Sequence, residues 1–169
     1  VELDWSPDGE WISFQLNNQL WRVSAYGGTP ERILEFPSFW PHWSGDSSRI
    51  YFVNPGSNSN QNSWGDLWHV TPDDPGSATF LDETQGFQFD ISDDGNFTVE
   101  AYFNAGLVMR RRDLGSDKLI PALEEGMALS YPVISPSGGR VAFYIVQEFS
   151  THTWTADLNN LINNLDGLP

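Results

Sequence analysis

The chain has 169 residues and a formal net charge of −15, because 23 acidic side chains stand against 8 basic ones. A surface this negative repels phosphate backbones, so nucleic acid is not an expected partner, whereas a basic protein surface or a hard cation is. Hydrophobic residues make up 39% of the chain and aromatic residues 14%, which is too apolar for a disordered protein.

Short-range composition points to β structure. The 15 glycines and 11 prolines are spread along the chain, as expected for many short strands joined by turns. The chain has no cysteine, so disulfides and thiolate metal sites are excluded. No apolar run approaches the roughly 18 residues of a membrane span. The first residue is Val1 rather than methionine, and we expect a processed or excised piece.

A fourfold repeat organises the chain. Four turns of related sequence recur, with their serines 38, 48 and 43 residues apart: residues 6–9 (SPDG), 44–47 (SGDS), 92–95 (SDDG) and 135–138 (SPSG). Periods near 40–45 residues are typical of propeller blades. Proline presets φ in such a turn, aspartate accepts hydrogen bonds from nearby amides, and glycine adopts positive φ. These residues are therefore interpreted as turn formers.

The flanks of the turns repeat in chain order as well. An apolar strand precedes each turn, at 3–5, 40–43, 87–91 and 131–134, and an alternating strand follows it, at 11–14, 50–53, 97–99 and 141–144. A third strand with a bulky residue comes next, at 20–23, 67–70, 107–109 and 153–155. A weaker fourth strand is predicted around 32–34, 78–81 and 119–122.

The best-formed repeat resembles the TolB-type, WD-like blade. It reads Trp5-Ser6-Pro7-Asp8-Gly9, then Leu20-Trp21-Arg22-Val23 and Gly27-Gly28-Thr29-Pro30. The resemblance implies an all-β propeller of four antiparallel four-stranded blades, standing alone or forming part of a larger ring. The predicted blades, called blades 1 to 4 below, are residues 1–38, 39–86, 87–128 and 129–169. We interpret the tryptophans at repeated positions as packing between blades: Trp5, Trp21, Trp43, Trp68 and Trp154.

One end of blade 2 is the predicted partner-binding site. The long polar segment 54–66 carries a tryptophan, which makes a plausible anchor, and residues 39–42 should lie on the same face. We expect Trp40 and Trp64 to lie near one another. The predicted site residues are Phe39, Trp40, His42, Asn62, Trp64 and Asp66.

No catalytic motif is present. The sequence lacks HExxH, G-x-S-x-G, a P-loop and G-x-G-x-x-G, and the acidic residues between 73 and 94 lack EF-hand spacing. We therefore expect no enzyme activity, no cofactor and no metal site. The tail at 158–168 has an i, i+3, i+4, i+7 apolar stripe, interpreted as a short helical turn or a last outer strand.

These features predict a non-enzymatic propeller scaffold that binds another protein, in the periplasm or outside the cell. One alternative is the gating propeller of a prolyl oligopeptidase-like or tricorn-like peptidase whose catalytic part is absent. Another is a sugar- or cation-binding module. Association with further blades or subunits is also expected, because an open stack of blades leaves apolar faces exposed.

Overall fold

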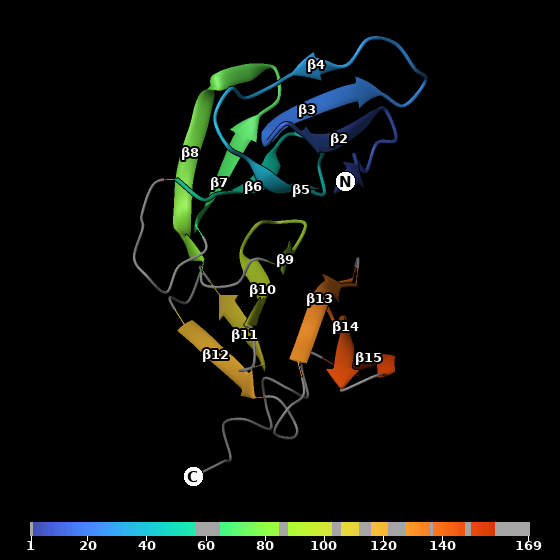
Figure 1. Ribbon diagram of the computed structural model, residues 1–169, viewed down its shortest axis with the longest axis vertical. Helices are drawn as coiled ribbons and strands as arrows, with labels where there is room; N and C mark the ends of the chain where they lie inside the picture. Colours follow the sequence, from blue (N-terminus) through green and yellow to red (C-terminus); the bar gives the residue numbers. More distant parts are fainter. Residues whose placement is uncertain are drawn as a thin grey trace. The chain divides into compact units, whose positions relative to one another are not determined.

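The computed structural model describes residues 2–56, 65–84, 88–102, 106–111, 116–121, 128–135, 137–147 and 150–157. All regular structure in these ranges is antiparallel β, arranged in four sheets that follow one another along the chain (Figure 1). No helix in these ranges is long and apolar enough to cross a membrane. The chain divides into two compact units, residues 1–87 and 88–169.

The first unit contains two four-stranded meanders. The sheet of blade 1 consists of β1 (Leu3–Trp5), β2 (Trp11–Leu16), β3 (Gln19–Ser24) and β4 (Glu31–Arg32). The sheet of blade 2 consists of β5 (Phe39–Trp43), β6 (Ile50–Asn54), β7 (Gly65–Thr71) and β8 (Asp74–Thr84). Each strand pairs with its neighbour in sequence, as the repeat predicted.

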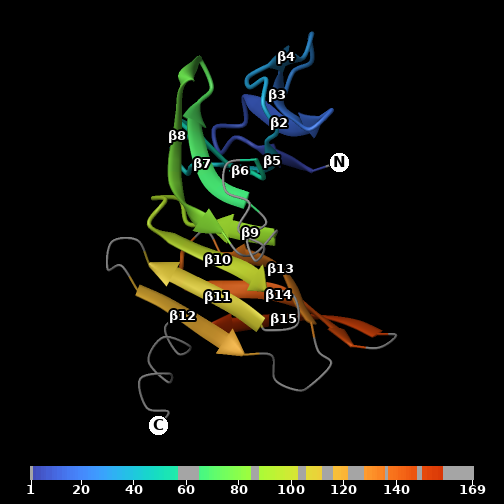
Figure 2. The ribbon, with the colours of Figure 1, turned by 60° about the vertical axis from the view of Figure 1, so that its left-hand side comes forward.

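The second unit repeats this meander order (Figure 2). The sheet of blade 3 consists of β9 (Gln88–Ile91), β10 (Phe97–Tyr102), β11 (Gly106–Arg111) and β12 (Ser116–Pro121). The sheet of blade 4 has three strands among the described residues: β13 (Ala128–Ile134), β14 (Arg140–Gln147) and β15 (Ser150–Asp157). The tail at 158–168, with its predicted helical stripe, lies outside the described residues.

The four repeated turns share one hydrogen-bond pattern. In each, the backbone N–H of the fourth residue donates to the carbonyl of the serine, with N···O distances of 2.7 to 2.9 Å. In three turns the serine hydroxyl also donates to the aspartate carboxylate at 2.6 Å: Ser6 to Asp8, Ser44 to Asp46, and Ser92 to Asp94. In the fourth turn Ser137 replaces the aspartate, and its hydroxyl lies 3.2 Å from that of Ser135. The motif is therefore a local device that closes the turn.

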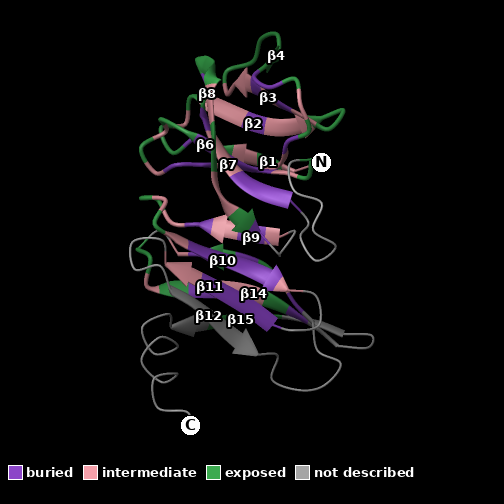
Figure 3. Ribbon diagram, turned by 90° about the vertical axis from the view of Figure 1, so that its left-hand side faces the viewer, coloured by how far each residue is buried: buried purple, intermediate pink, exposed green. Residues whose placement is uncertain are grey.

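An apolar core lies between the two blades of each unit. In the first unit it contains Leu20, Ile33 and Leu34 from blade 1, with Trp43, Ile50, Phe52 and Val70 from blade 2. In the second unit it contains Val99, Ala101, Leu107 and Met109 from blade 3, with Leu129, Ile134, Val141 and Ile145 from blade 4. The middle strands β6 and β10 are buried along most of their length, as the colouring of Figure 3 shows for β10. Burial of this apolar surface holds each pair of blades together.

The predicted packing role of the repeated tryptophans is correct for some positions and wrong for Trp5. Trp43 is buried, and Trp21 and Trp68 are half-buried. Trp5, at the repeat position of Trp43, is 53% exposed. Asp4 faces blade 2, so strand alternation turns Trp5 to the opposite face of the sheet, which no blade of this unit covers. The side chain of Trp154 lies outside the described residues.

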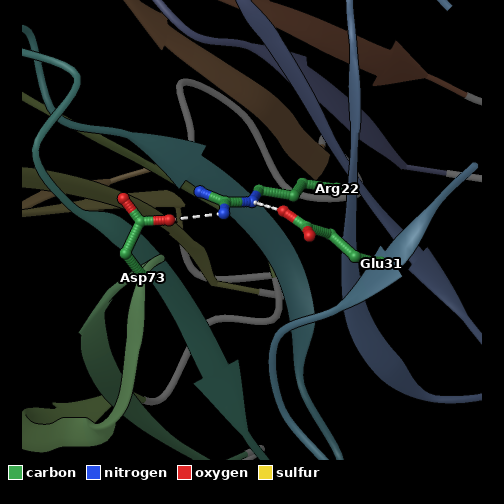
Figure 4. A network of polar contacts seen from close by, with 3 residues as sticks. All are labelled: Arg22, Glu31 and Asp73. Atoms are coloured by element: carbon green, nitrogen blue, oxygen red, sulfur yellow. Dashed lines mark hydrogen bonds and ion pairs between the residues drawn. The ribbon is translucent and has the colours of Figure 1, made fainter. Parts of the chain in front are cut away.

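Polar contacts also join blades 1 and 2. Arg22, on β3, pairs with Glu31 on β4 and with Asp73 in the turn between β7 and β8, the latter at 2.5 Å (Figure 4). The Arg22 guanidinium lies 4.2 Å from the centre of the Trp11 ring. The Arg22 side chain is only 10% exposed, whereas those of Glu31 and Asp73 are 52% and 82% exposed, so a largely buried guanidinium meets two carboxylates that reach solvent.

Candidate functional site

The predicted site centres on Trp40, which adopts an unusual backbone conformation. Its φ is 52°, a left-handed value that is costly for a bulky residue and is concentrated at functional positions. A β-bulge between Phe39 and His42 accommodates it in the β5–β6 ladder. Both the backbone amide and the indole of Trp40 donate to Glu2, at the start of blade 1, and the Phe39 ring lies 5.6 Å away between centroids. Trp40 is thus held from two sides.

The second unit repeats this construction at Tyr131. Tyr131 stands four residues before Ser135, as Trp40 stands before Ser44, and its φ is 49°. A bulge again interrupts the ladder, between Ser130 and Val133. The Tyr131 N–H donates to the side-chain oxygen of Gln88 at 2.9 Å, and the side chain is 59% exposed. Each unit therefore holds one aromatic residue in a left-handed conformation on the first strand of its second blade.

The carboxyl group of Glu2 is electrostatically perturbed. Burial raises its pKa, while the two hydrogen bonds from Trp40 and the nearby His42 act in the opposite direction. Its Oε2 atom is buried without a hydrogen-bond partner.

Asp66 occupies a different environment from the predicted loop. It lies in β7, and its residue surface is only 1% exposed. Burial raises the pKa of its carboxyl, and the neighbouring Glu83 raises it further. The Oδ1 atom has no hydrogen-bond partner. Strand β7 begins one residue earlier, at Gly65, whose φ is 153°. Glycine is required there because an added Cβ would lie 2.6 Å from the carbonyl oxygen of Asn54.

The structure brings Phe39 and Asp66, with Trp40 beside Phe39, to one end of blade 2, whereas His42 pairs with Tyr51 near the turn at Ser44. Phe39 pairs with Val53, and Val53 pairs with Leu67 on its other side, so Phe39 and Asp66 lie at the same end of the sheet. This end is opposite the turn at Ser44. Asn62 and Trp64 lie outside the described residues, and with them the predicted proximity of Trp64 to Trp40.

Two further residues with these features, Glu2 in the first unit and Tyr131 in the second, were not predicted. Tyr131 could have been found from its repeat position, four residues before the turn serine. Glu2 could not, because its role depends on a contact across 38 residues of sequence with the next blade. Within the described ranges, no three or more His, Cys, Asp or Glu side chains come together as a metal site.

Comparison with solved structures identifies the fold. No family model matches the chain. A protein from Agrobacterium tumefaciens, provisionally assigned as TolB, superposes with a TM-score of 0.70 and 22% identity over 94% of this chain. The chain has a TolB-type β-propeller fold. It spans 61% of that structure.

Other proteins share this propeller fold. The tricorn protease superposes with a TM-score of 0.67 and 15% identity, covering 95% of this chain, which spans 16% of the protease. An auxiliary nutrient binding protein from Bacteroides thetaiotaomicron superposes with a TM-score of 0.66 and 13% identity. The superposition covers 93% of this chain and 38% of that protein. In sequence, an uncharacterised Agrobacterium fabrum protein is 37% identical over 57 residues, which are 30% of this chain and 20% of that protein. Likeness to these structures therefore indicates the fold and not an activity.

Proposed function

We propose that the chain is a non-enzymatic propeller module that binds another protein through the end of blade 2 around Trp40. The observation that carries this proposal is the left-handed Trp40, buttressed by Phe39 and by hydrogen bonds to Glu2. Backbone strain of this kind persists only where surrounding contacts maintain it, and pre-organised aromatic residues are frequent anchors of protein interfaces.

The charge around this end favours a partner with a basic surface. The Glu2 carboxyl contacts Trp40, and the whole chain carries a net charge of −15. Long-range attraction of this sign accelerates encounter with a cationic partner and is screened by salt. We place the module in the periplasm or outside the cell, which its cysteine-free composition and its TolB-type fold support.

A selected peptide can test this proposal. Peptides enriched from a displayed random library on the immobilised wild-type chain are titrated calorimetrically against Trp40→Ala and Tyr26→Ala. Tyr26 is the matched control because it is 81% exposed and its hydroxyl contacts Glu10, beyond the turn at the other end of blade 1. We expect Trp40→Ala to weaken binding about tenfold or more, with Tyr26→Ala unchanged. Equal affinity for both variants would place the binding face elsewhere.

The same experiment addresses catalysis. Mass spectrometry of the selected peptide after prolonged incubation should recover it intact, as a binding module requires. Time-dependent cleavage or modification of the peptide by the purified chain would overturn the non-enzymatic assignment.

A second candidate is a propeller that gates a peptidase. It is favoured by the superpositions on the tricorn protease and on a prolyl endopeptidase, of which this chain spans 16% and 33%. In that case the parent gene encodes a catalytic domain. A G-x-S-x-G nucleophile elbow in the parent coding sequence would support gating and count against the stand-alone scaffold.

A further inference from the structure

Within each unit the repeated turns of the two blades lie side by side, and in the first unit a hydroxyl group joins them. The backbone N–H of Asp8, in the turn of blade 1, donates to Oγ of Ser47, in the turn of blade 2, at 3.1 Å. Ser47 is the fourth residue of its turn and has a φ of 59°. A serine at this position therefore fills the space between the two turns.

The second unit lacks this bridge. The residues at the same repeat positions are Asp94 and Gly138, and Gly138 has no hydroxyl to offer. Its φ is 68°, close to that of Ser47, so the backbone path is conserved while the side chain is missing. A pocket of about 280 Å³ lies between the two turns, lined by Ile91, Ser92, Asp93, Asp94, Ile134, Ser135, Ser137 and Gly138.

Several polar groups of this pocket are already engaged by the turns. The Asp94 carboxylate accepts hydrogen bonds from the Ser92 hydroxyl and from the backbone and side-chain amides of Asn96. Ser135 Oγ accepts from the Arg140 N–H and lies 3.2 Å from Ser137 Oγ. These groups shape the pocket walls and contribute little hydrogen-bonding capacity to a ligand.

Other groups remain available to a ligand. Among the described residues, the backbone N–H of Asp94 contacts its own carboxylate but lacks the inter-turn hydroxyl that Ser47 supplies to Asp8, and the Asp93 carboxylate has no hydrogen bond. Ile91 and Ile134, which are 6% and 8% exposed, provide apolar surface. The pocket thus offers a backbone donor, one charged acceptor and an apolar patch.

We propose that this pocket binds a neutral polyhydroxylated molecule of monosaccharide size. Adjacent sugar hydroxyls can donate to both oxygens of the Asp93 carboxylate, while a third accepts from the Asp94 N–H. The C–H face of the sugar can pack against Ile91 and Ile134. The two aspartates repel phosphate and carboxylate ligands, and the volume is close to the lower end of small-molecule sites.

Replacing Gly138 by serine tests the site with a residue the fold already accepts. Ser47 shows that serine adopts this conformation, and a Cβ at Gly138 meets no atom within 4 Å. The new hydroxyl should bridge to the Asp94 N–H and fill the pocket. Gly9→Ser is the matched control, since Gly9 is the fourth residue of the blade 1 turn and has a φ of 78° with the same free space.

Binding is measured by amide NMR shifts during titration with glucose, galactose, mannose and N-acetylglucosamine, and with choline as a cationic comparison. We expect at least one sugar to shift the amides of Asp93, Asp94 and Ser137 saturably. Gly138→Ser should weaken this binding about tenfold or more, and Gly9→Ser should not. Asp93→Asn, which leaves the turn hydrogen bonds intact, should also weaken it.

Three results would overturn the proposal. They are the absence of saturable shifts at these amides with every sugar, undiminished sugar binding by Gly138→Ser, and a response to choline alone. Shifts confined to the Trp40 region would likewise assign the sugar to a different site.

Discussion

The Asp4 carboxylate accepts a hydrogen bond from the backbone N–H of Trp43, at 2.8 Å, and so joins the first strand of blade 1 to the first strand of blade 2. Asp90 and Ile134 form the equivalent contact between blades 3 and 4, at 2.6 Å. In both cases the aspartate stands two residues before the turn serine of its own blade. The donor residue immediately precedes the turn serine of the following blade. The contact thus recurs once in each unit.

Removal of this carboxylate should destabilise the first unit. We expect Asp4→Ala to lower the free energy of unfolding by about 1–3 kcal/mol, because the Trp43 N–H then loses a charged acceptor at a partly buried position. Asp4→Asn retains an acceptor oxygen and should lose less. Urea denaturation measures both. Asp74→Ala, which removes an exposed carboxylate, is the control. If Asp74→Ala lowers the free energy of unfolding as much as Asp4→Ala does, the Asp4 contact has no specific stabilising effect.

The Arg22 junction should distinguish arginine from lysine. Lysine cannot contact Glu31 and Asp73 through a planar fork while stacking on Trp11, so Arg22→Lys is expected to cost about 1–2 kcal/mol. Asp73→Ala should cost less, about 0–1 kcal/mol, since that side chain is 82% exposed. Thermal unfolding compares the two. A larger loss in Asp73→Ala would contradict this ranking.

Asp66 should make the stability depend on pH. Because burial raises its pKa in the folded state, its favourable contribution is present below the unfolded pKa, about 3.9, and is lost as pH rises through the folded value. Asp66→Asn should therefore be more stable than the wild type at pH 7, and the difference should shrink below about pH 4. Melting temperatures across this range test the prediction. A variant less stable than the wild type at pH 7 would show that the folded state stabilises the charged form.

The turn aspartates should act in the opposite sense. The Ser44 hydroxyl is the main cause that lowers the pKa of Asp46 to about 2, and the pKa values of Asp8 and Asp94 are also lowered, chiefly by their turn serines. Their stabilising contribution is present above the unfolded pKa, about 3.9, and is lost as pH falls through the folded values. Carboxyl NMR titration of Ser44→Ala should show the pKa of Asp46 raised toward its ordinary value.

The fourth turn supplies a control for this titration. Ser135 faces Ser137 instead of an aspartate, so Ser135→Ala removes a hydroxyl without altering a carboxyl group. Acid unfolding of Ser135→Ala should keep the pH midpoint of the wild type, whereas that of Ser44→Ala should shift. Identical midpoints would mean that the serine–aspartate pair does not couple to folding.

Local chemistry accounts for the part of the fold that could be predicted. The hydrogen bonds of each turn span at most five residues, and side chains alternate along the neighbouring strands with a period of two. Both features can therefore be predicted from a short stretch of sequence. The order of the strands follows because each one pairs with its neighbour along the chain.

Contacts between blades decided the rest. Trp5 and Trp43 occupy the same repeat position, yet only Trp43 is buried, because blade 1 covers it. The partnership of Glu2 with Trp40 and the pocket beside Gly138 likewise arise where two segments about 40 residues apart meet. Turn formation depends on residues within one turn and can be inferred from them. Burial and pocket shape depend on which surface the neighbouring blade presents, and only the tertiary structure supplies that surface.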